Sequence, residues 1–511
     1  MFIKLGMLVV FFAITIAIGL YCRKHSTDVN GFVLGGRSVG PWLTAFAYGT
    51  SYFSAVVFVG YAGQFGWKYG VAATWAGIGN ALLGSLLAWS VLGRRTRVMT
   101  QHLDSATMPQ FFQSRFDSKA LKLAASAIIF IFLIPYTASL YNGLSRLFGM
   151  AFDIDYSVCV IVMAILTGIY VIAGGYMATA INDFIQGIIM IVGIVAVIAA
   201  VLKGQGGFLE ALNKLGQVSD PAVSETPGIF ASFFGPDPVN LLGVVILTSL
   251  GTWGLPQMVQ KFYAIKSEQA ISKGMIISTI FAALVAGGCY FLGGFGRLFD
   301  VDVATQGYDA VVPTMLSGLP TILIAVVIVL VLAASMSTLS SLVLTSSSTL
   351  TLDFIKGTLV KKMDEKKQLL TMRALIVVFI AISVVLAIVQ YKSNVTFIAQ
   401  LMGVSWGALA GAFLAPFLFG LYWKKATRAS VWCSFAFSTV VMLANTVAKP
   451  MFPAMLQSPI NAGAFCMIAG LIIVPVVSLV TPKMDKAYVD QVFSCYDRQV
   501  TVNVTDSIGD K

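Results

Sequence analysis

Long apolar runs follow one another along almost the whole chain, and this pattern limits the possible folds more than any other feature. A helix needs about 20 apolar residues to cross the hydrocarbon core of a bilayer. The chain is 58% hydrophobic and 11% charged, whereas soluble proteins are about half apolar and about a quarter charged. The pattern therefore predicts an all-α polytopic membrane protein with 13 transmembrane helices. The predicted spans are 4–21, 41–66, 71–93, 120–147, 155–174, 181–202, 240–260, 274–296, 319–350, 374–391, 395–422, 429–447 and 462–480.

The basic residues predict the orientation of these spans. With the N-terminus outside and the C-terminus inside, 25 of the 33 Lys and Arg fall on the cytoplasmic side, as the positive-inside rule requires. The first run, 4–21, is predicted to be a retained span, because it is long for a leader and its basic residues follow it. We expect one transmembrane domain over 1–480 and a cytoplasmic tail over 481–511. The longest predicted outer segment, 203–238, contains GGFLEALNKLGQV, a pattern that predicts a short amphipathic helix.

Other function classes lack their usual signatures. The six cysteines are scattered with no CxxC pair, and both histidines lie in basic loops, so we expect neither disulfides nor a His or Cys metal site. The net charge of +11 comes from basic residues in the short loops between spans, which membrane topology explains, so no nucleic-acid partner is expected. The predicted spans contain no paired carboxylates and no nucleophile with a base, so the protein is not expected to be an enzyme and has no predicted catalytic residue.

Three predicted spans carry features that interrupt a helix. The second has Gly49, Thr50, Ser51 and Ser54 at its centre, and the seventh reads ILTSLGTWGLP over 246–256. Transporters place binding sites at such interruptions near the membrane midplane. The two spans are five apart, which suggests two five-helix repeats over 41–202 and 240–422, with 4–21 and 429–480 peripheral. Close packing of helices at small residues is an equally good explanation of the glycines.

The third feature is the hydroxyl-rich stretch VLAASMSTLSSLVLTSSSTLTLDF in the ninth span. Ser337 and Thr338 follow Ala334 by three and four residues, and Ser341 follows Thr338 by three, so the four share one helical face. Helix packing or hydrogen bonds to carbonyls one turn earlier would explain most of these hydroxyls. Adjacent hydroxyls facing an unwound segment would also suit a monovalent cation such as Na⁺, with Ser341 on its path towards the cytoplasm.

Acidic residues are rare in the predicted spans. Asp183 stands just inside the sixth span, where it would face a wet cavity or stabilise a helix N-terminus. Asp353 ends the ninth span and is expected at the cytoplasmic surface. No Lys or Arg is expected to be buried in a span, so an anionic solute would depend on helix ends and hydroxyls.

Four motifs stand in order along the chain: FVLGGRSVGPWLTAF, DSATMPQFFQSRF, YVIAGGYMATAINDFIQG and AASMSTLSS. Together they resemble the sodium:solute symporter family over about residues 5 to 480, and most closely its sodium/proline branch. The resemblance implies a LeuT-like core of two inverted five-helix repeats with a sodium site between the second and ninth spans. It implies that carbonyls of Thr50, Phe53 and Ala334 and hydroxyls of Ser337 and Thr338 bind sodium, and that Asp183 passes sodium towards the cytoplasm.

The implied function is a sodium-coupled secondary active symporter that imports a small organic solute by alternating access. An amino acid such as proline, a related carboxylate or a sugar would be the solute, sodium the coupling ion, and the bacterial inner (plasma) membrane the location. The alternative is a solute-sensing subunit of the same fold without transport. Residues expected to line the solute site are Ser54, Tyr136, Ser139, Thr248, Thr252, Trp253, Gln400 and Trp406.

The chain departs from the family pattern at three places. Gln110 stands where an acid is usual, Tyr52 stands where the sodium/proline symporter has an Asp, and Thr248 and Thr252 stand where aromatic residues are expected. These differences favour a wider or more polar pocket and another organic solute than proline. The sequence specifies neither the stoichiometry nor the oligomeric state.

Overall fold

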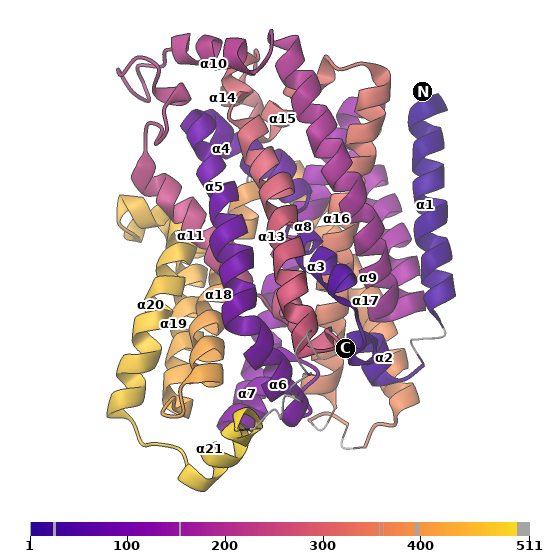
Figure 1. Cartoon of the computed structure of the whole chain (residues 1–511), viewed down its shortest axis with the longest axis vertical. Helices are drawn as coiled ribbons and strands as arrows, with labels where there is room; N and C mark the ends of the chain where they lie inside the picture. The colour runs from indigo at the N-terminus through magenta and orange to yellow at the C-terminus, as the bar shows by residue number, and fades with distance from the viewer. Residues whose placement is uncertain are drawn as a thin grey trace, which may run out of the picture.

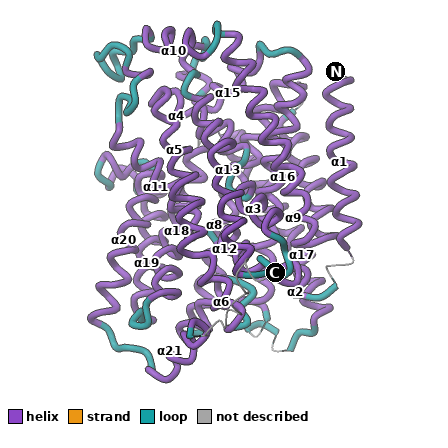
Figure 2. Tube along the Cα trace, viewed as in Figure 1, coloured by secondary structure: helices purple, strands orange, loops and turns teal. Residues whose placement is uncertain are grey.

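A bundle of long helices makes up the computed structural model, which describes residues 2–23, 27–152, 155–356, 358–360, 362–393 and 398–497. The end of the predicted tail, 498–511, and the start of the predicted span 395–422 lie outside the described residues. Figures 1 and 2 show helices running between two ends of the molecule, with short connections. The N-terminus, α10, α14 and α15 lie at one end, and α2, α6, α7 and α21 at the other (Figure 1).

The helix boundaries follow the apolar runs closely. The α-helices are α1 (Phe2–Cys22), α2 (Val29–Leu34), α3 (Pro41–Thr50), α4 (Ala62–Tyr69), α5 (Thr74–Gly79), α6 (Arg94–His102), α7 (Met108–Phe116), α8 (Lys119–Phe152), α9 (Tyr156–Gly204), α10 (Phe208–Gln217), α11 (Pro238–Gly254), α12 (Pro256–Ala264), α13 (Glu268–Gly293), α14 (Val303–Gln306), α15 (Val311–Ser317), α16 (Thr321–Thr349), α17 (Glu365–Ser393), α18 (Ile398–Tyr422), α19 (Arg428–Val447), α20 (Pro459–Val480) and α21 (Lys486–Phe493). Four π-helical segments are Val56–Tyr61, Asn80–Leu87, Trp89–Gly93 and Leu350–Ile355. The amphipathic pattern after residue 203 forms α10, as predicted.

Ten helical segments of the described residues are long and apolar enough to cross a membrane, or eleven if the bent pair α11 and α12 forms one span. Two of the ten, Val56–His102 and Tyr156–Gly204, have 47 and 49 residues. A straight helix of that length would measure about 70 Å, more than twice the hydrocarbon core of about 30 Å. Glycines with positive φ interrupt both, Gly70 at 61° and Gly175 at 55°. The fold is therefore that of a multi-pass helical membrane protein.

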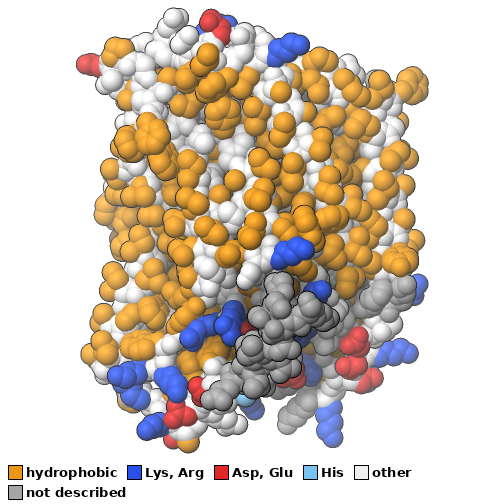
Figure 3. Space-filling model, in the orientation of Figure 1, with side chains coloured by type: hydrophobic (Ala, Val, Ile, Leu, Met, Phe, Trp, Pro, Cys, Tyr) orange, Lys and Arg blue, Asp and Glu red, His pale blue; other side chains and the backbone are white. Residues whose placement is uncertain are grey.

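The outer surface fits this environment. Figure 3 shows hydrophobic side chains over most of the height of the bundle on the visible face, with Lys and Arg gathered mainly at the end that carries α6 and α21. Figure 1 shows α1 along one side of the bundle and α19 with α20 along the other. Helix α16 is buried at every residue from Val327 to Ser348 and packs against α8 and α9.

Two of the three predicted interruptions are confirmed. Helix α3 ends at Thr50, and the chain is not helical again until Ala55. Helix α11 ends at Gly254, Leu255 is extended (φ −76°, ψ 123°), and α12 begins at Pro256 with a bend of 45°. Both breaks put free backbone groups inside the bundle, because the last carbonyls of a helix have no partner within it.

The predicted interruption of the ninth span is wrong, since α16 runs unbroken from Thr321 to Thr349 and continues as π-helix. The physical reason is local hydrogen bonding. Hydroxyls such as those of Ser340, Ser347 and Ser348 donate to carbonyls one turn earlier, at 2.8, 3.2 and 3.1 Å. These bonds satisfy the hydroxyls without breaking the helical ladder.

Gly175 lets the chain turn sharply between the two halves of α9. Its φ of 55° and ψ of −146° belong to a region that essentially only glycine occupies. A Cβ at this position would also lie 2.8 Å from the carbonyl oxygen of Phe32 in α2. Both the conformation and the close approach of the two backbones therefore require glycine.

We expect Gly175→Ala to lower the free energy of unfolding by about 1–3 kcal/mol or more, because alanine would be strained there and would contact the Phe32 backbone. Gly168→Ala, in the same helix, is the matched control, since its Cβ would meet only Ile380 Cδ1, at 3.4 Å. Thermal unfolding of the purified variants in detergent measures the difference. Equal stability of the two variants would contradict the role given to Gly175.

Candidate sodium and solute site

Five oxygen atoms meet where the broken end of α3 faces the middle of α16. Ser337 Oγ lies 3.2 Å from the carbonyl oxygen of Thr50 and 2.9 Å from that of Ala334. Thr338 Oγ1 lies 3.0, 3.2 and 3.1 Å from the carbonyl oxygens of Thr50, Phe53 and Ala334. All five residues are fully buried. The residues predicted to bind sodium are thus brought together in one cluster.

The chemistry of this cluster fits a cation. Each hydroxyl carries one proton, so the two hydroxyls satisfy at most two of the hydrogen bonds that the three carbonyls can accept. The lone pairs therefore outnumber the protons in a buried place, where an unsatisfied acceptor is costly. A small hard cation is coordinated by oxygens of this kind.

Towards the end that carries α6 and α7, the cluster continues through hydroxyls to an ion pair. Ser51 Oγ lies 3.0 Å from Ser341 Oγ, and Lys261 Nζ donates to the same Ser341 Oγ at 3.0 Å. Lys261 Nζ also lies 3.9 Å from Asp183 Oδ2. The structure therefore brings both predicted ion-path residues, Asp183 and Ser341, to the same lysine.

The expectation that no Lys or Arg is buried in a span is wrong, because Lys261 in α12 is 2% exposed. The break at Leu255 directs α12 into the bundle, where it packs against α3 and α16. The predicted span 240–260 runs through this break and ends one residue before Lys261, so the sequence places the lysine in a cytoplasmic loop. The available signal was Pro256, which begins a new helix only five residues before the lysine.

The predicted solute residues divide into two groups. Tyr136 and Trp406 pack edge to face with ring centroids 5.9 Å apart. Ser139 lies one turn from Tyr136 and donates to its carbonyl at 2.7 Å, and Ser54 Oγ accepts from Val56 N at 3.2 Å. A Cβ at Gly251 would lie 2.5 Å from Trp406 Cε3, so the glycine at the end of α11 makes room for this ring.

The polar side chains of the second group mostly hydrogen-bond to helix carbonyls. Thr252 Oγ1 donates to the carbonyl of Gly84 at 2.9 Å, and Trp253 Nε1 to that of Leu83 at 2.9 Å, so both tie α11 to the π-helical segment Asn80–Leu87. Thr248 Oγ1 donates to Val244 one turn earlier. Gln400 is half-buried in the first turn of α18.

Aromatic polar groups without hydrogen bonds are the feature that the sequence did not reveal. Among the described residues, the hydroxyls of Tyr52, Tyr61, Tyr136 and Tyr290 and the indole nitrogen of Trp406 are buried without a hydrogen bond of normal geometry. Tyr136 lies within reach of Trp406 and Ser54, and Tyr290 within reach of Asn80. Tyr61 lies near Tyr136, and Tyr290 lies near Tyr52 and Tyr61. Buried donors are normally satisfied, so this group points to a ligand with acceptor atoms.

Comparison with known proteins assigns the family. A model of the sodium:solute symporter family matches residues 32–435. The chain belongs to the sodium:solute symporter family. It is also 31% identical over 496 residues to the sodium/proline symporter of Staphylococcus aureus (strain JH9), which covers 94% of this chain and 92% of the relative. The protein is therefore a sodium-coupled transporter of a solute, with Na⁺ as coupling ion, and not an enzyme.

Solved structures share the fold. A Na⁺-coupled sialic acid symporter in a substrate-bound outward-open state aligns with a TM-score of 0.75 and 17% identity, over 95% of this chain and 99% of that chain. MHP1, a nucleobase-cation-symport-1 family transporter in a closed conformation, aligns with a TM-score of 0.50 and 14% identity, over 90% of this chain and 97% of that chain. These neighbours are LeuT-like transporters, so the predicted fold class is supported at that level.

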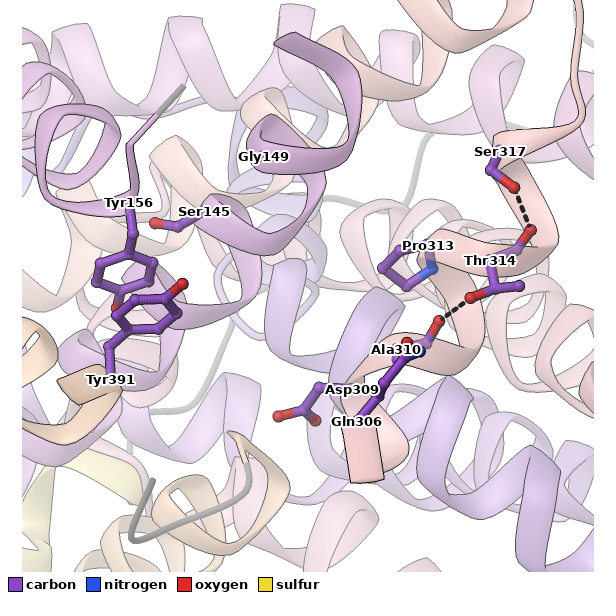
Figure 4. Close-up of a pocket in the computed structure, with 10 residues that line it drawn as sticks. All are labelled: Ser145, Gly149, Tyr156, Gln306, Asp309, Ala310, Pro313, Thr314, Ser317 and Tyr391. Carbon is purple, nitrogen blue, oxygen red and sulfur yellow. Dashed lines mark hydrogen bonds between the residues drawn. The ribbon is translucent and has the colours of Figure 1, made fainter. Parts of the chain in front are cut away.

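An outer cavity of about 370 Å³ lies apart from the oxygen cluster in this symporter (Figure 4). Tyr156 and Tyr391 stack at one side with ring centroids 3.8 Å apart, and α15 with its flanking turn forms the other side. Asp309 in that turn accepts a hydrogen bond from the first backbone nitrogen of α18, Ile398 N, at 3.3 Å. None of the predicted site residues is among the ten that line this cavity, which are Ser145, Gly149, Tyr156, Gln306, Asp309, Ala310, Pro313, Thr314, Ser317 and Tyr391.

Asp353 lies towards the symporter's opposite end, and its predicted position at the cytoplasmic surface is wrong because it is fully buried. Its carboxylate accepts from Thr107 Oγ1 at 2.6 Å and from Gln110 Nε2 at 2.8 Å, which joins the start of α7 to the end of α16. Gln110 is the position where the family usually has an acid. Here an amide is needed, because it donates to a carboxylate.

We expect Gln110→Glu to destabilise the protein by about 1–3 kcal/mol, because it replaces this donor by a second carboxylate beside Asp353. The loss should shrink as the pH falls, since a shared proton removes the repulsion between the two carboxyls. Gln113→Glu is the control, because Gln113 lies on α7 and is only half-buried. The measurement is thermal unfolding of the purified variants from about pH 8 down to about pH 5, towards the ordinary pKa of a carboxyl. A loss of stability that does not change with pH would contradict the contact.

Proposed function

We propose that the oxygen cluster of Thr50, Phe53, Ala334, Ser337 and Thr338 is the sodium site that couples solute transport to the sodium gradient. One observation carries the proposal: three carbonyl oxygens and two hydroxyl oxygens converge at a break in a buried helix. Each hydroxyl lies within 3.2 Å of the carbonyl oxygens that it contacts. Sodium there would join α3 to α16. Its binding would stabilise one arrangement of the core and so favour solute binding, and by reciprocity the solute would favour sodium.

The proposed core consists of two inverted five-helix repeats, 41–202 and 240–422. The helix breaks that follow α3 and α11 occupy equivalent positions in the two repeats, which supports this division. If α11 and α12 form one span and each long segment crosses twice at its glycine, the number of spans is 13. An odd number agrees with the N-terminus and α21 at opposite ends (Figure 1).

The proposed topology places the N-terminus outside and the tail 481–511 in the cytoplasm. The gathering of Lys and Arg around α6 and α21 supports this orientation (Figure 3). The transmembrane domain would cover 1–480, with 4–21 and 429–480 as peripheral helices. The lipid bilayer that surrounds it would be the bacterial plasma membrane.

The proposed solute is a small organic molecule with acceptor atoms, such as an amino acid or a related carboxylate or sugar. The unsatisfied phenol and indole donors around Tyr136 and Trp406 support it, because a carboxylate or sugar oxygen would accept from them. Their neighbours Ser54 and Ser139 complete the proposed lining. Proline is the first compound to test because of the 31% identical sodium/proline symporter.

We expect Ser337→Ala and Thr338→Val each to raise the sodium concentration for half-maximal uptake by about tenfold or more, because each removes one oxygen ligand from a site of five. Ser347→Ala is the control, since Ser347 is buried in the same helix and its hydroxyl donates only to Leu344 at 3.2 Å. Sodium titration of initial uptake rates in proteoliposomes measures the effect. Unchanged sodium dependence in both site variants would refute the site.

Uptake itself is the test of the solute class. We expect purified protein in proteoliposomes to accumulate one member of a panel of amino acids, carboxylates and sugars when sodium is high outside, and not when potassium replaces sodium. Thermal stabilisation by the same solute in sodium provides an independent measure of binding. Sodium-dependent binding without accumulation would instead identify a solute-sensing subunit.

A further inference from the structure

The ion pair between α12 and α9 is a buried charge pair that the sodium site does not explain. Lys261 Nζ and Asp183 Oδ2 are 3.9 Å apart, and their side chains are 2% and 0% exposed. Charged side chains inside a membrane protein are costly and occur where they act on a transported ion or solute. Lys261 is in α12, directly after the break that separates it from α11.

The ammonium lies about one helical turn from the proposed sodium site. Lys261 donates to Ser341, which follows Thr338 by three residues on α16, and Ser341 in turn contacts Ser51, the residue after Thr50. Three residues of helix correspond to about 4.5 Å. A sodium ion that leaves the cluster towards the cytoplasm would therefore meet this ammonium first.

The ammonium holds Asp183 only loosely. A charge-assisted N–H···O bond is usually about 2.7–2.9 Å long, well below the 3.9 Å observed. Among the described residues, neither carboxylate oxygen of Asp183 has a hydrogen-bond partner. The amide of Gln186, one turn further along α9, is also buried without a hydrogen bond. Lys261 itself is further stabilised by the ring of Tyr176, 5.1 Å from its Nζ. The carboxylate is neutralised but still has acceptor capacity for a second cation.

We propose that the ammonium of Lys261 is a built-in cation that neutralises Asp183 when sodium is absent and gives way when a sodium ion passes towards the cytoplasm. This inference rests on the sodium site and path proposed above. One carboxylate cannot balance two cations in a buried environment, so sodium near Asp183 and the ammonium in its present position disfavour each other. Once sodium has left, the lysine restores a neutral core, and the empty transporter can reorient without an unpaired buried charge.

The competition has a direct consequence for sodium binding. Removing the ammonium leaves the Asp183 carboxylate uncompensated beside the sodium path. Sodium should then bind more tightly, because the negative charge attracts it and no tethered cation opposes it. A lysine that served only to pack α12 against α16 would have the opposite effect, since its loss would loosen the site.

The experiment measures sodium binding with no solute present. Full-length variants are purified in detergent, and the sodium concentration for half-maximal thermal stabilisation is titrated against choline at constant ionic strength. We expect Lys261→Gln to lower this concentration about tenfold, and Lys261→Arg, which keeps a cation, to stay within about threefold of the parent. In the double variant Lys261→Gln/Asp183→Asn the sodium affinity should return to within about threefold of the parent.

Lys266→Gln is the matched control, because it removes an exposed lysine just after α12 and should leave sodium binding unchanged. Weaker or unchanged sodium binding in Lys261→Gln would overturn the proposal. So would tighter binding that persists in the double variant, because the effect would not depend on Asp183. If Lys261→Gln can be purified only in sodium, the ion replaces the missing ammonium and the proposal is supported. If it cannot be purified even in sodium, the proposal fails.

The outcomes also separate this inference from the proposed sodium site. If sodium stabilises neither the parent nor any variant, the sodium site itself is wrong. If sodium stabilises the parent and Ser337→Ala weakens that effect, the site stands whatever Lys261→Gln shows. The Lys261 variants then decide only whether the ammonium competes with sodium.

Discussion

The need to satisfy backbone polar groups without water determines the centre of this protein. In a bilayer, each unpaired carbonyl costs several kcal/mol, so an interrupted helix is tolerated only where other groups in the protein supply partners. Helix α3 ends at Thr50 in the middle of the bundle, and the carbonyls of Thr50 and Phe53 face α16. Ser337 and Thr338 supply hydroxyls to these carbonyls, yet two protons cannot satisfy three carbonyls and two hydroxyl oxygens. The break therefore leaves acceptor oxygens that a cation could bind. The carbonyls that would be unsatisfied in an isolated α3 are the same atoms that would serve as ligands.

A cation bound in this position can couple two helices that move relative to each other. The oxygens of the cluster come from α16 and from the broken end of α3, so a sodium ion at the proposed site would stabilise the arrangement in which these segments are close. The membrane potential contributes about 2.3 kcal/mol per charge per 100 mV, and a tenfold solute gradient costs about 1.4 kcal/mol. One sodium ion per solute is sufficient to drive accumulation. A buried carboxylate joins segments near each end of the molecule: Asp309 accepts from the start of α18 on one side, and Asp353 accepts from Thr107 and Gln110 on the other.

The sequence predicted features that depend on neighbours along the chain. Apolar runs predicted the spans, and the clusters around Gly49 and Pro256 predicted the breaks, because helix formation and its interruption are local. The continuity of α16 was missed, since the hydroxyls of residues such as Ser340 bond within the helix. The burial of Lys261 and Asp353 was missed for another reason. Each lies close to the end of an apolar run, and only the path of the chain after that run determines whether such a residue reaches the surface.

Asp183, Lys261 and Asp353 are buried charged residues, and the protein stabilises the two carboxylates in different ways. Asp353 is stabilised by short hydrogen bonds from neutral donors, at 2.6 and 2.8 Å. Each of its carboxylate oxygens therefore already accepts a hydrogen bond, which leaves less capacity for a cation. Asp183 has no such donors among the residues that the structure describes, and its counter-charge is an ammonium 3.9 Å away. Neutral donors fix a carboxylate in place, whereas a mobile ammonium can exchange with another cation. A carboxylate held by neutral donors suits a lasting contact between two segments, as between Asp353 and the start of α7. An exchangeable counter-ion suits a position on the path of a transported ion, and this difference in partners distinguishes Asp183 from Asp353 more clearly than their shared burial does.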